Sequence, residues 1–186
     1  MTPGLEMRDL GAHEVASYLQ LRSDQRESEV RARLARGHRC RTLRWEGRIV
    51  HAGWLARGLA DVPYLEGRLV LQPDDLYSYD SFTAPDWRGR GLAPVRHLDL
   101  LRGAAGPGAR RLLVVVALEN RSGLRVFAKL AYRTLGGYRV ARLGPWRRWW
   151  VESGGHDALP ELRPWRGGAR RDAERRVPAP GPEGTS

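Results

Sequence analysis

The hydrophobic and polar positions of the chain follow two periods, and together they predict a domain that mixes helices and strands. Apolar residues recur at helical spacing over residues 12–22. A second helix is expected to begin at residue 24 or 28 and to end at 35, where Gly37 supplies a C-terminal cap. Two strands at 41–45 and 49–55 should follow, joined by a Glu-Gly-Arg turn.

The second half of the chain continues the mixture. Residues 59–75 are expected to hold a loop, a short helical piece near 64–69 and a Pro-Asp-Asp turn. We then expect a strand at 76–83, a helix at 94–101 and a strand buried on both faces at 111–118. A helix at 122–130 and a closing hairpin of 138–143 with 146–151 complete the order. This order describes an α/β sandwich with a mixed sheet rather than a repeated parallel βα unit.

Composition divides the chain into a body and a tail. Residues 1–152 can form one ordinary domain, whereas 153–186 are rich in Gly, Pro, Arg and Glu and should be largely disordered, because few large apolar residues offset the cost of ordering. Leu159, Leu162 and Trp165 are exceptions that we expect to dock a short piece onto the body. Disorder is expected beyond Gly167.

The single cysteine, Cys40, cannot form an internal disulfide, which favours a reducing compartment. No apolar stretch approaches the roughly 20 residues that a membrane helix needs, and the N-terminus lacks an apolar signal core. The five histidines show no metal-ligand spacing with Cys40 or with one another, so no metal is expected. We therefore expect a cytoplasmic protein that associates with no membrane.

The formal net charge of +11 permits contact with polyanions without indicating a nucleic-acid-binding protein. Lys129 is the only lysine, and the arginines lie throughout the chain, interleaved with acidic residues. No RNP, zinc-finger or helix-turn-helix pattern is present. A basic nucleic-acid-associated protein stays an alternative, but the same charge would equally attract the phosphates of a nucleotide cofactor.

The strongest local signal is the stretch 88–93, which joins an expected strand to an expected helix. Gly89 and Gly91 let the backbone approach a ligand closely, and the free N–H groups at a helix start bind phosphate oxygens. Arg88 and Arg90 add positive charge. The stretch lacks the spacing and the Gly-Lys-Ser/Thr ending of a Walker loop, and it does not fit the dinucleotide pattern G-x-G-x-x-G because residue 94 is proline. A phosphate-binding turn and a simple tight connection both stay open at this point.

Two motifs together resemble the GNAT superfamily of acyl-CoA-dependent N-acetyltransferases. The sequence Arg88-Gly89-Arg90-Gly91-Leu92-Ala93 fits the signature [QR]-x-x-G-x-[GA], and Pro85-Asp86-Trp87 precedes it. About 30 residues later, the segment 119–133 resembles the helix N-x-x-[AS]-x-x-x-[YF]-x-K-[LM]-G-[FY] of that family. The resemblance covers roughly residues 10–150.

The resemblance implies a GNAT-like mixed, mostly antiparallel sheet flanked by helices and splayed between its fourth and fifth strands. It implies acetyl-CoA, or another acyl-CoA, as co-substrate. The acceptor would be a primary amine of a small molecule or peptide, which attacks the thioester directly in a ternary complex. We expect a monomer or a homodimer.

Several residues receive roles by their position in the resemblance. The backbone of Ser81, Phe82 and Thr83 would pair with the pantetheine arm, while Asn120 would contact that arm near its sulfur. The pyrophosphate would be held by the turn, through Arg88, Gly89, Arg90, Gly91, Leu92 and Ala93.

The general base is not fixed by the resemblance, and two carboxylates are candidates. Asp80 lies on the expected strand 76–83, which corresponds to the fourth strand of the family, and Glu119 follows the expected strand 111–118, which corresponds to the fifth. Each has a structural alternative: Asp80 pairs with an arginine, or Glu119 caps the next helix.

The sequence departs from the family pattern at the general acid. The tyrosine expected seven residues after Asn120 is Phe127, and the usual glycine before the final aromatic is Ala131. Another group or water then acts as acid, the thiolate leaves unassisted, or the chain is a degenerate acyl-CoA-binding protein without catalysis. His97 is expected on the surface or in the core rather than in catalysis.

The acceptor pocket is expected to draw on residues 22–36, 59–75 and 143–150. The last of these contains a dense cluster of tryptophan and arginine at 146–150. A stacking platform for an acidic or planar acceptor is one interpretation of this cluster. A hairpin with one face on the core is the interpretation that we favour.

Overall fold

The structure is a computed structural model that describes residues 4–104, 106–143, 146–154 and 158–165. The chain forms two compact units. The first unit comprises Met1–Gly58 and Leu71–Arg133, and the second comprises Leu59–Val70 and Thr134–Ser186. The described residues contain no helix that is both long and apolar enough to cross a membrane.

The first unit is built on a five-stranded sheet in the order β1-β2-β3-β6-β7. Its strands are β1 (Leu5–Asp9), β2 (Arg39–Trp45), β3 (Arg48–Ala56), β6 (Asp75–Thr83) and β7 (Arg111–Leu113). All neighbours pair antiparallel except β6 and β7, which are parallel. The expected mixed, mostly antiparallel sheet is confirmed.

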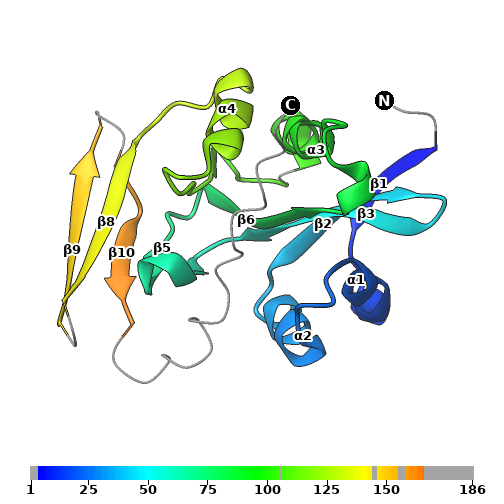
Figure 1. Ribbon diagram of the computed structural model, residues 1–186, viewed down its shortest axis with the longest axis horizontal. Coiled ribbons are helices and arrows are strands. Elements are labelled where there is room, and N and C mark those ends of the chain that lie inside the picture. The colour runs from blue at the N-terminus through cyan, green and yellow to red at the C-terminus, as the bar shows by residue number, and fades with distance from the viewer. Residues whose placement is uncertain (1–3, 105, 144–145, 155–157, 166–186) are drawn as a thin grey trace, which may run out of the picture. The chain divides into compact units, whose positions relative to one another are not determined.

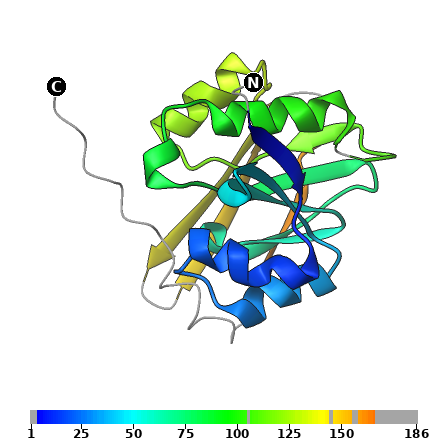
Figure 2. The same cartoon turned by 90° about the vertical axis from the view of Figure 1, so that its right-hand side faces the viewer.

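Four helices cover the two faces of this sheet, and Figures 1 and 2 show α1 and α2 on one face and α3 and α4 on the other. Their bounds are α1 (Val15–Leu21), α2 (Glu27–Ala35), α3 (Leu92–Asp99) and α4 (Arg121–Lys129). Short turns precede α1 and α3, at η1 (Ala12–Glu14) and η3 (Pro85–Trp87), and η4 (Leu100–Ala104) follows α3. As expected, Gly37 follows the end of α2 with a positive φ of 80°.

Each face of the sheet has its own apolar core. Under α1 and α2, Tyr18 and Val30 pack with the fully buried Trp54 of β3. On the opposite face, Leu92 of α3 packs against β2 and β3, and Leu100 packs against β3 and β6. These contacts fix the helices that flank β6, which is the strand that leads into the glycine turn.

The first unit differs from the sequence-based picture in two places. β1 was not predicted, and it pairs with β2 from Leu5↔Trp45 to Asp9↔Arg41. The strand expected at 111–118 is only Arg111–Leu113, and its residues are half-buried rather than buried on both faces. β7 lies at the edge of the sheet, so strand neighbours shield it on one side only.

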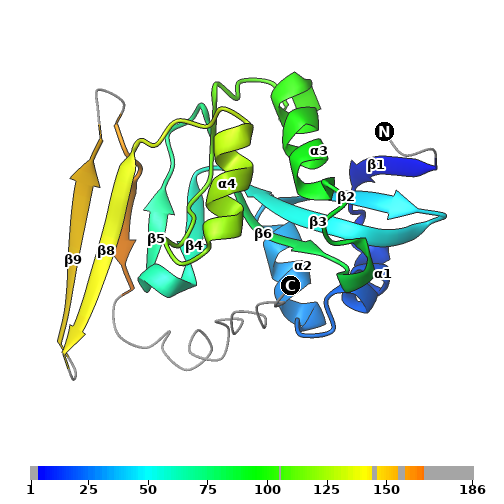
Figure 3. The same cartoon turned by 45° about the horizontal axis from the view of Figure 1, so that its top comes forward.

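The second unit contains two small sheets, which Figure 3 shows. One has the order β10-β5-β4, with β4 (Leu59–Val62), β5 (Gly67–Val70) and β10 (Glu161–Pro164). The other is the hairpin of β8 (Gly136–Leu143) and β9 (Trp146–Ser153), close to its expected position.

The loop expected within 59–75 is mostly strand, and the helical piece expected near 64–69 is a single turn at its start. These residues form the antiparallel pair β4–β5, and the only helical turn between the two strands is η2 (Pro63–Leu65). Ala60 and Val62 are buried in alternation with more exposed neighbours, which is the period of a strand, but four residues are too few to reveal it in the sequence.

Part of the segment that we expected to be a tail forms β10. Leu162 lies opposite Leu69 of β5 in an antiparallel pair. The disorder expected beyond Gly167 falls outside the described residues.

Candidate functional site

The glycine turn after β6 is open to solvent and ends at the start of α3. Gly89 and Gly91 have φ angles of 74° and 73°, which few other residues adopt without strain. Gly91 is the N-cap of α3, and Leu92 behind it is buried. Among the described residues other than its immediate chain neighbours, neither glycine has an atom within 4 Å of the position that a Cβ would take. The turn therefore combines empty space with the helix-start N–H groups that lack partners within the helix.

Arginine side chains flank this turn, and aromatic rings hold them. The Arg90 guanidinium carbon lies 4.6 Å from the centre of the Trp87 ring. That of Arg88 lies 5.8 Å from the centre of the Phe82 ring. Both arginines are exposed, so the rim of the turn is positively charged and suits an anionic ligand.

In the described part of the chain, the last residues of β6 pair with β3 on one side and with no strand on the other. Phe82 and Thr83 pair with Ala52 and His51 of β3. On the other side, the pairing with β7 runs from Asp75↔Arg111 to Tyr77↔Leu113. Ser81, Phe82 and Thr83 thus lie beyond the last β6–β7 pair, in the part of the strand where we expected a pantetheine arm. That role and the splay itself stay proposals.

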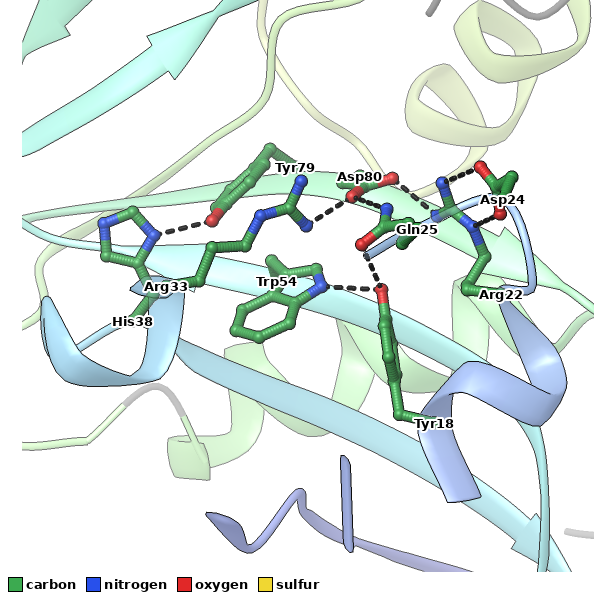
Figure 4. A network of polar contacts seen from close by, with 9 residues as sticks. All are labelled: Tyr18, Arg22, Asp24, Gln25, Arg33, His38, Trp54, Tyr79 and Asp80. Carbon is green, nitrogen blue, oxygen red and sulfur yellow. Dashed lines mark hydrogen bonds and ion pairs between the residues drawn. The ribbon is translucent and has the colours of Figure 1, made fainter. Parts of the chain in front are cut away.

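Asp80 lies at an irregularity of β6 and is held by three side chains, as Figure 4 shows. Its φ is 46°, and the register with β3 shifts between Ala52 and Trp54. The carboxylate accepts hydrogen bonds from Arg22 Nη1 at 2.6 Å, from Arg33 Nη1 at 2.5 Å and from Gln25 Nε2 at 2.8 Å. This carboxylate links α1, α2 and the segment between them to the middle of β6.

The surroundings of Asp80 make it a weak base. Burial raises the pKa of its carboxyl, but the charges of Arg33 and Arg22 outweigh burial and lower it to about 2. Gln25 connects to the buried Tyr18 hydroxyl at 3.4 Å, and Trp54 Nε1 donates to that hydroxyl at 2.8 Å. The geometry favours the ion-paired alternative for Asp80 over a proton-accepting role.

Glu119 and Asn120 meet at the start of α4. Asn120 is the N-cap: its Oδ1 accepts from Gly123 N at 2.9 Å and from Ser122 Oγ at 3.0 Å. Glu119 is exposed, and its backbone oxygen accepts from Arg121 N. The side chain that caps this helix is therefore Asn120 and not Glu119. A contact between Asn120 and a cofactor stays a proposal.

A buried polar cluster between β6, α3 and the end of α4 was missed by the sequence reasoning. Arg96 Nη2 lies 2.9 Å from Ser78 Oγ and 3.0 Å from His97 Nε2, and His97 Nδ1 lies 2.8 Å from the Tyr132 hydroxyl. Arg96 and His97 are almost fully buried. Burial and the charge of Arg96 lower the pKa of His97 to about 3. His97 is therefore a core residue, one of the two positions expected for it.

The cluster depends on a glycine in the neighbouring strand. A Cβ built on Gly53 of β3 would lie 2.5 Å from the guanidinium carbon of Arg96. The signal that could have revealed the cluster is an arginine on the core-facing side of the helix after the turn.

In the second unit, the tryptophan and arginine cluster of β9 divides between two faces. Trp149 Nε1 donates to Leu65 O at 2.9 Å, and Arg147 forms an ion pair with Glu66. Trp146 is 77% exposed and Trp150 is 40% exposed, with Arg148 over the Trp150 ring. The favoured interpretation, a hairpin with one face on a core, therefore describes the face of Arg147 and Trp149. The other face exposes Trp146 and Trp150.

Comparisons with known proteins give a likeness of structure alone. No family model matches this chain, and no curated protein matches its sequence. Among solved structures, AAC(6')-Iy in complex with the bisubstrate analog CoA-S-monomethyl-acetylneamine matches with a TM-score of 0.56 at 13% identity, over 70% of this chain and 91% of that chain.

Two further structures match in the same way. A ribosomal-protein-alanine N-acetyltransferase from Brucella melitensis has a TM-score of 0.56 at 15% identity, over 75% of this chain and 99% of its own. A Trypanosoma brucei acetyltransferase has a TM-score of 0.53 at 20% identity, over 75% and 98%. At these identities the likeness establishes a shared fold.

Proposed function

We propose that this chain, which has the fold of the GNAT acetyltransferases, moves an acetyl or other acyl group from acyl-CoA to a primary amine. The observation that carries the proposal is the open glycine turn at the start of α3, since an unobstructed helix N-terminus with arginines at its rim suits a pyrophosphate. The fold supports it, because the AAC(6')-Iy structure with this architecture contains a CoA bisubstrate analog.

The binding roles follow from position. The amides of Gly89 to Ala93 would hold the pyrophosphate, and Arg88 and Arg90 would neutralise its charge. The backbone of 81–83, beyond the last pair with β7, would bind the pantetheine arm and bring the thioester carbonyl to the middle of the sheet. Asn120 would act mainly by fixing the start of α4 beside that arm.

The chemistry is a direct attack by a neutral amine on the thioester carbon. We propose that Asp80 serves this step by fixing Arg22 and Arg33 against β6, because a carboxyl with a pKa of about 2 accepts a proton poorly. Glu119 is exposed just before α4 and is the candidate base that remains. The attacking amine loses its proton to Glu119 through water.

Two acceptor classes come from the structural neighbours. The AAC(6')-Iy complex contains an acetylneamine group, and the Brucella protein is a ribosomal-protein-alanine acetyltransferase. Neamine and a peptide with N-terminal alanine are therefore the first probes for a primary amine acceptor.

The test is a thermal-shift titration with acetyl-CoA, CoA and longer acyl-CoAs. Wild type and Gly91→Glu are compared, with Gly47→Glu as a matched control. Gly47 also has a positive φ and is exposed, and in the described part of the chain nothing lies within 4 Å of the position that a Cβ would take there. At a ligand concentration of 100 Kd the stabilisation is about 2.7 kcal/mol, or roughly 5–10 °C in Tm. Wild type and Gly47→Glu should show it, and Gly91→Glu should not.

The outcomes separate the alternatives. A folded wild type that shifts with no CoA species refutes the cofactor site and returns the glycine stretch to a simple turn. A shift without CoA release in the presence of neamine, the peptide or other amines would favour a binding protein without catalysis. Tight, salt-dependent binding of an oligonucleotide in place of CoA would favour the nucleic-acid alternative.

A further inference from the structure

Phe127 occupies the position at which the resemblance expects a proton-donating tyrosine, but the ring of a tyrosine, Tyr132, packs against it. The rings of Phe127 and Tyr132 meet edge to face with their centres 5.1 Å apart. Tyr132 follows Ala131, whose φ of 57° ends α4 and turns the chain back, and Tyr132 N donates to Phe127 O at 3.0 Å. The backbone itself therefore places the Tyr132 ring against Phe127.

The hydrogen bonds of His97 can be assigned a direction. Arginine nitrogens only donate, so at the 3.0 Å contact between Arg96 Nη2 and His97 Nε2 the imidazole nitrogen must be the acceptor. A neutral imidazole that accepts at Nε2 carries its proton at Nδ1. The 2.8 Å contact from Nδ1 to the Tyr132 hydroxyl is then an N–H that donates to the phenol oxygen.

This direction leaves the proton of Tyr132 available. The phenol oxygen accepts from His97, so its own O–H is not used in that bond and can point elsewhere. Tyr132 is half-buried rather than enclosed. Burial raises the pKa of Tyr132 to about 12 while Arg96 acts to lower it, so the phenol carries its proton at neutral pH.

The cluster also suits the phenolate that a proton transfer would leave behind. Arg96 is fully buried, and its Nε and Nη1 atoms have no hydrogen-bond partner in the described part of the chain. No carboxylate among the described residues is recorded in an ion pair with it. Its positive charge therefore acts through His97 on the Tyr132 oxygen, which is the arrangement that stabilises a developing anion.

We infer that Tyr132 is the general acid of this chain, doing from the end of α4 what Phe127 cannot do, and this inference rests on the proposed acyl transfer. The C–S bond of the tetrahedral intermediate breaks, its electron pair stays on sulfur, and the Tyr132 O–H gives its proton to form the CoA thiol. The phenolate, held by His97 Nδ1–H, then regains through water the proton that the amine gave to Glu119, and the carboxyl of Glu119 is ionised again.

The experiment moves the hydroxyl back to the position where the family has it. Tyr132→Phe, Phe127→Tyr and the double variant are compared with wild type by the rate of CoA thiol release, with acetyl-CoA and whichever of neamine or the alanine peptide wild type uses. Tyr138→Phe is the matched control, because it removes a tyrosine hydroxyl from the second unit, where that group donates to Pro160 O.

Tyr132→Phe should lower kcat by at least about 100-fold, since a positioned acid contributes roughly 10²–10⁴. Its thermal shift with acetyl-CoA should match that of wild type, which shows that the fold and the binding site are intact. The double variant should regain at least about tenfold of the lost kcat, and Tyr138→Phe should keep the wild-type rate.

Two results overturn the inference without refuting acyl transfer. The first is a kcat for Tyr132→Phe within about threefold of wild type, which is well below the effect of a positioned acid. The second is a loss of both kcat and the thermal shift with acetyl-CoA in that variant. A double variant no faster than Tyr132→Phe also counts against it. A wild type that binds acetyl-CoA and turns over no amine refutes the transferase proposal, and the inference falls with it.

Discussion

Replacing Asp80 by asparagine removes one negative charge with little change of shape. Asparagine, like aspartate, tolerates the φ of 46° found at this position, so the backbone of β6 should keep its irregularity. The carboxylate pairs with Arg22 and Arg33, whose side chains are only 10% and 18% exposed. Arg22 keeps its bond to Asp24 in the variant, whereas Arg33 loses the partner at 2.5 Å.

The cost of the change follows from two estimates. The pKa of Asp80 falls from 3.8 to about 2, and at about 1.4 kcal/mol for each pH unit between these values the pairing contributes roughly 2 kcal/mol. Breaking a buried ion pair costs about 3–5 kcal/mol when the remaining charge is sealed from water. Since these side chains keep some exposure, we expect about 2–3 kcal/mol, or a Tm lower by roughly 5–10 °C.

The pH dependence has a definite sign. The carboxyl has a lower pKa in the folded state than in the unfolded state, so its contribution is complete above about pH 4–5 and is lost as the pH falls through about 2. The assay is urea unfolding followed by circular dichroism at pH 7, 4, 3 and 2. The stability difference between wild type and Asp80→Asn should shrink toward zero at the lowest pH, because groups common to both proteins cancel.

Asp61→Asn is the matched control, since Asp61 pairs with Arg68 where both side chains are more than a third exposed. It should cost less than about 1 kcal/mol. The reasoning fails if Asp80→Asn lies within about 0.5 kcal/mol of wild type at pH 7, a change typical of neutral surface substitutions. It fails equally if the difference does not depend on pH.

Two further predictions concern the buried arginine and the end of α4. Gly53→Ala should destabilise the fold by about 2–3 kcal/mol in urea unfolding, because the added Cβ would lie 2.5 Å from the Arg96 guanidinium carbon. Adding Arg96→Met should recover stability, and a double variant no more stable than Gly53→Ala would refute this cause. Ala131→Gly should stabilise the fold by about 0.5–1 kcal/mol, since φ at Ala131 is 57°. Ala128→Gly within the exposed side of α4 should instead cost about 1 kcal/mol, and equal effects at the two positions would contradict the backbone argument.

The sequence predicted best those features that depend on neighbouring residues. The end of the second helix could be predicted because Gly37 marks it, and the structure ends α2 at Ala35. The glycine turn was found for the same reason, since its positive φ angles require glycines that are visible in the chain. The hairpin of β8 and β9 was likewise set by its own alternation and turn.

Features that depend on distant partners could not be predicted. Asp80 takes its charge environment from Arg22 and Arg33, which lie 58 and 47 residues away. The bond from His97 to Tyr132 spans 35 residues. The strands β4 and β5 are too short to show a period. The second strand that pairs with β5 is β10, which lies in the segment that we expected to be a disordered tail.

The three-stranded sheet of the second unit also sets an order of events during synthesis. β5 at Gly67–Val70 must pair with β10 at Glu161–Pro164, whereas every strand pair of the first unit is complete once Leu113 has been made. A chain that emerges from the ribosome N-terminus first can therefore form the strand pairs of the first unit before β10 has been synthesised to pair with β5. That long separation makes the β5–β10 pairing a late and slow contact, and until it forms β5 presents an unpaired strand edge to other nascent chains.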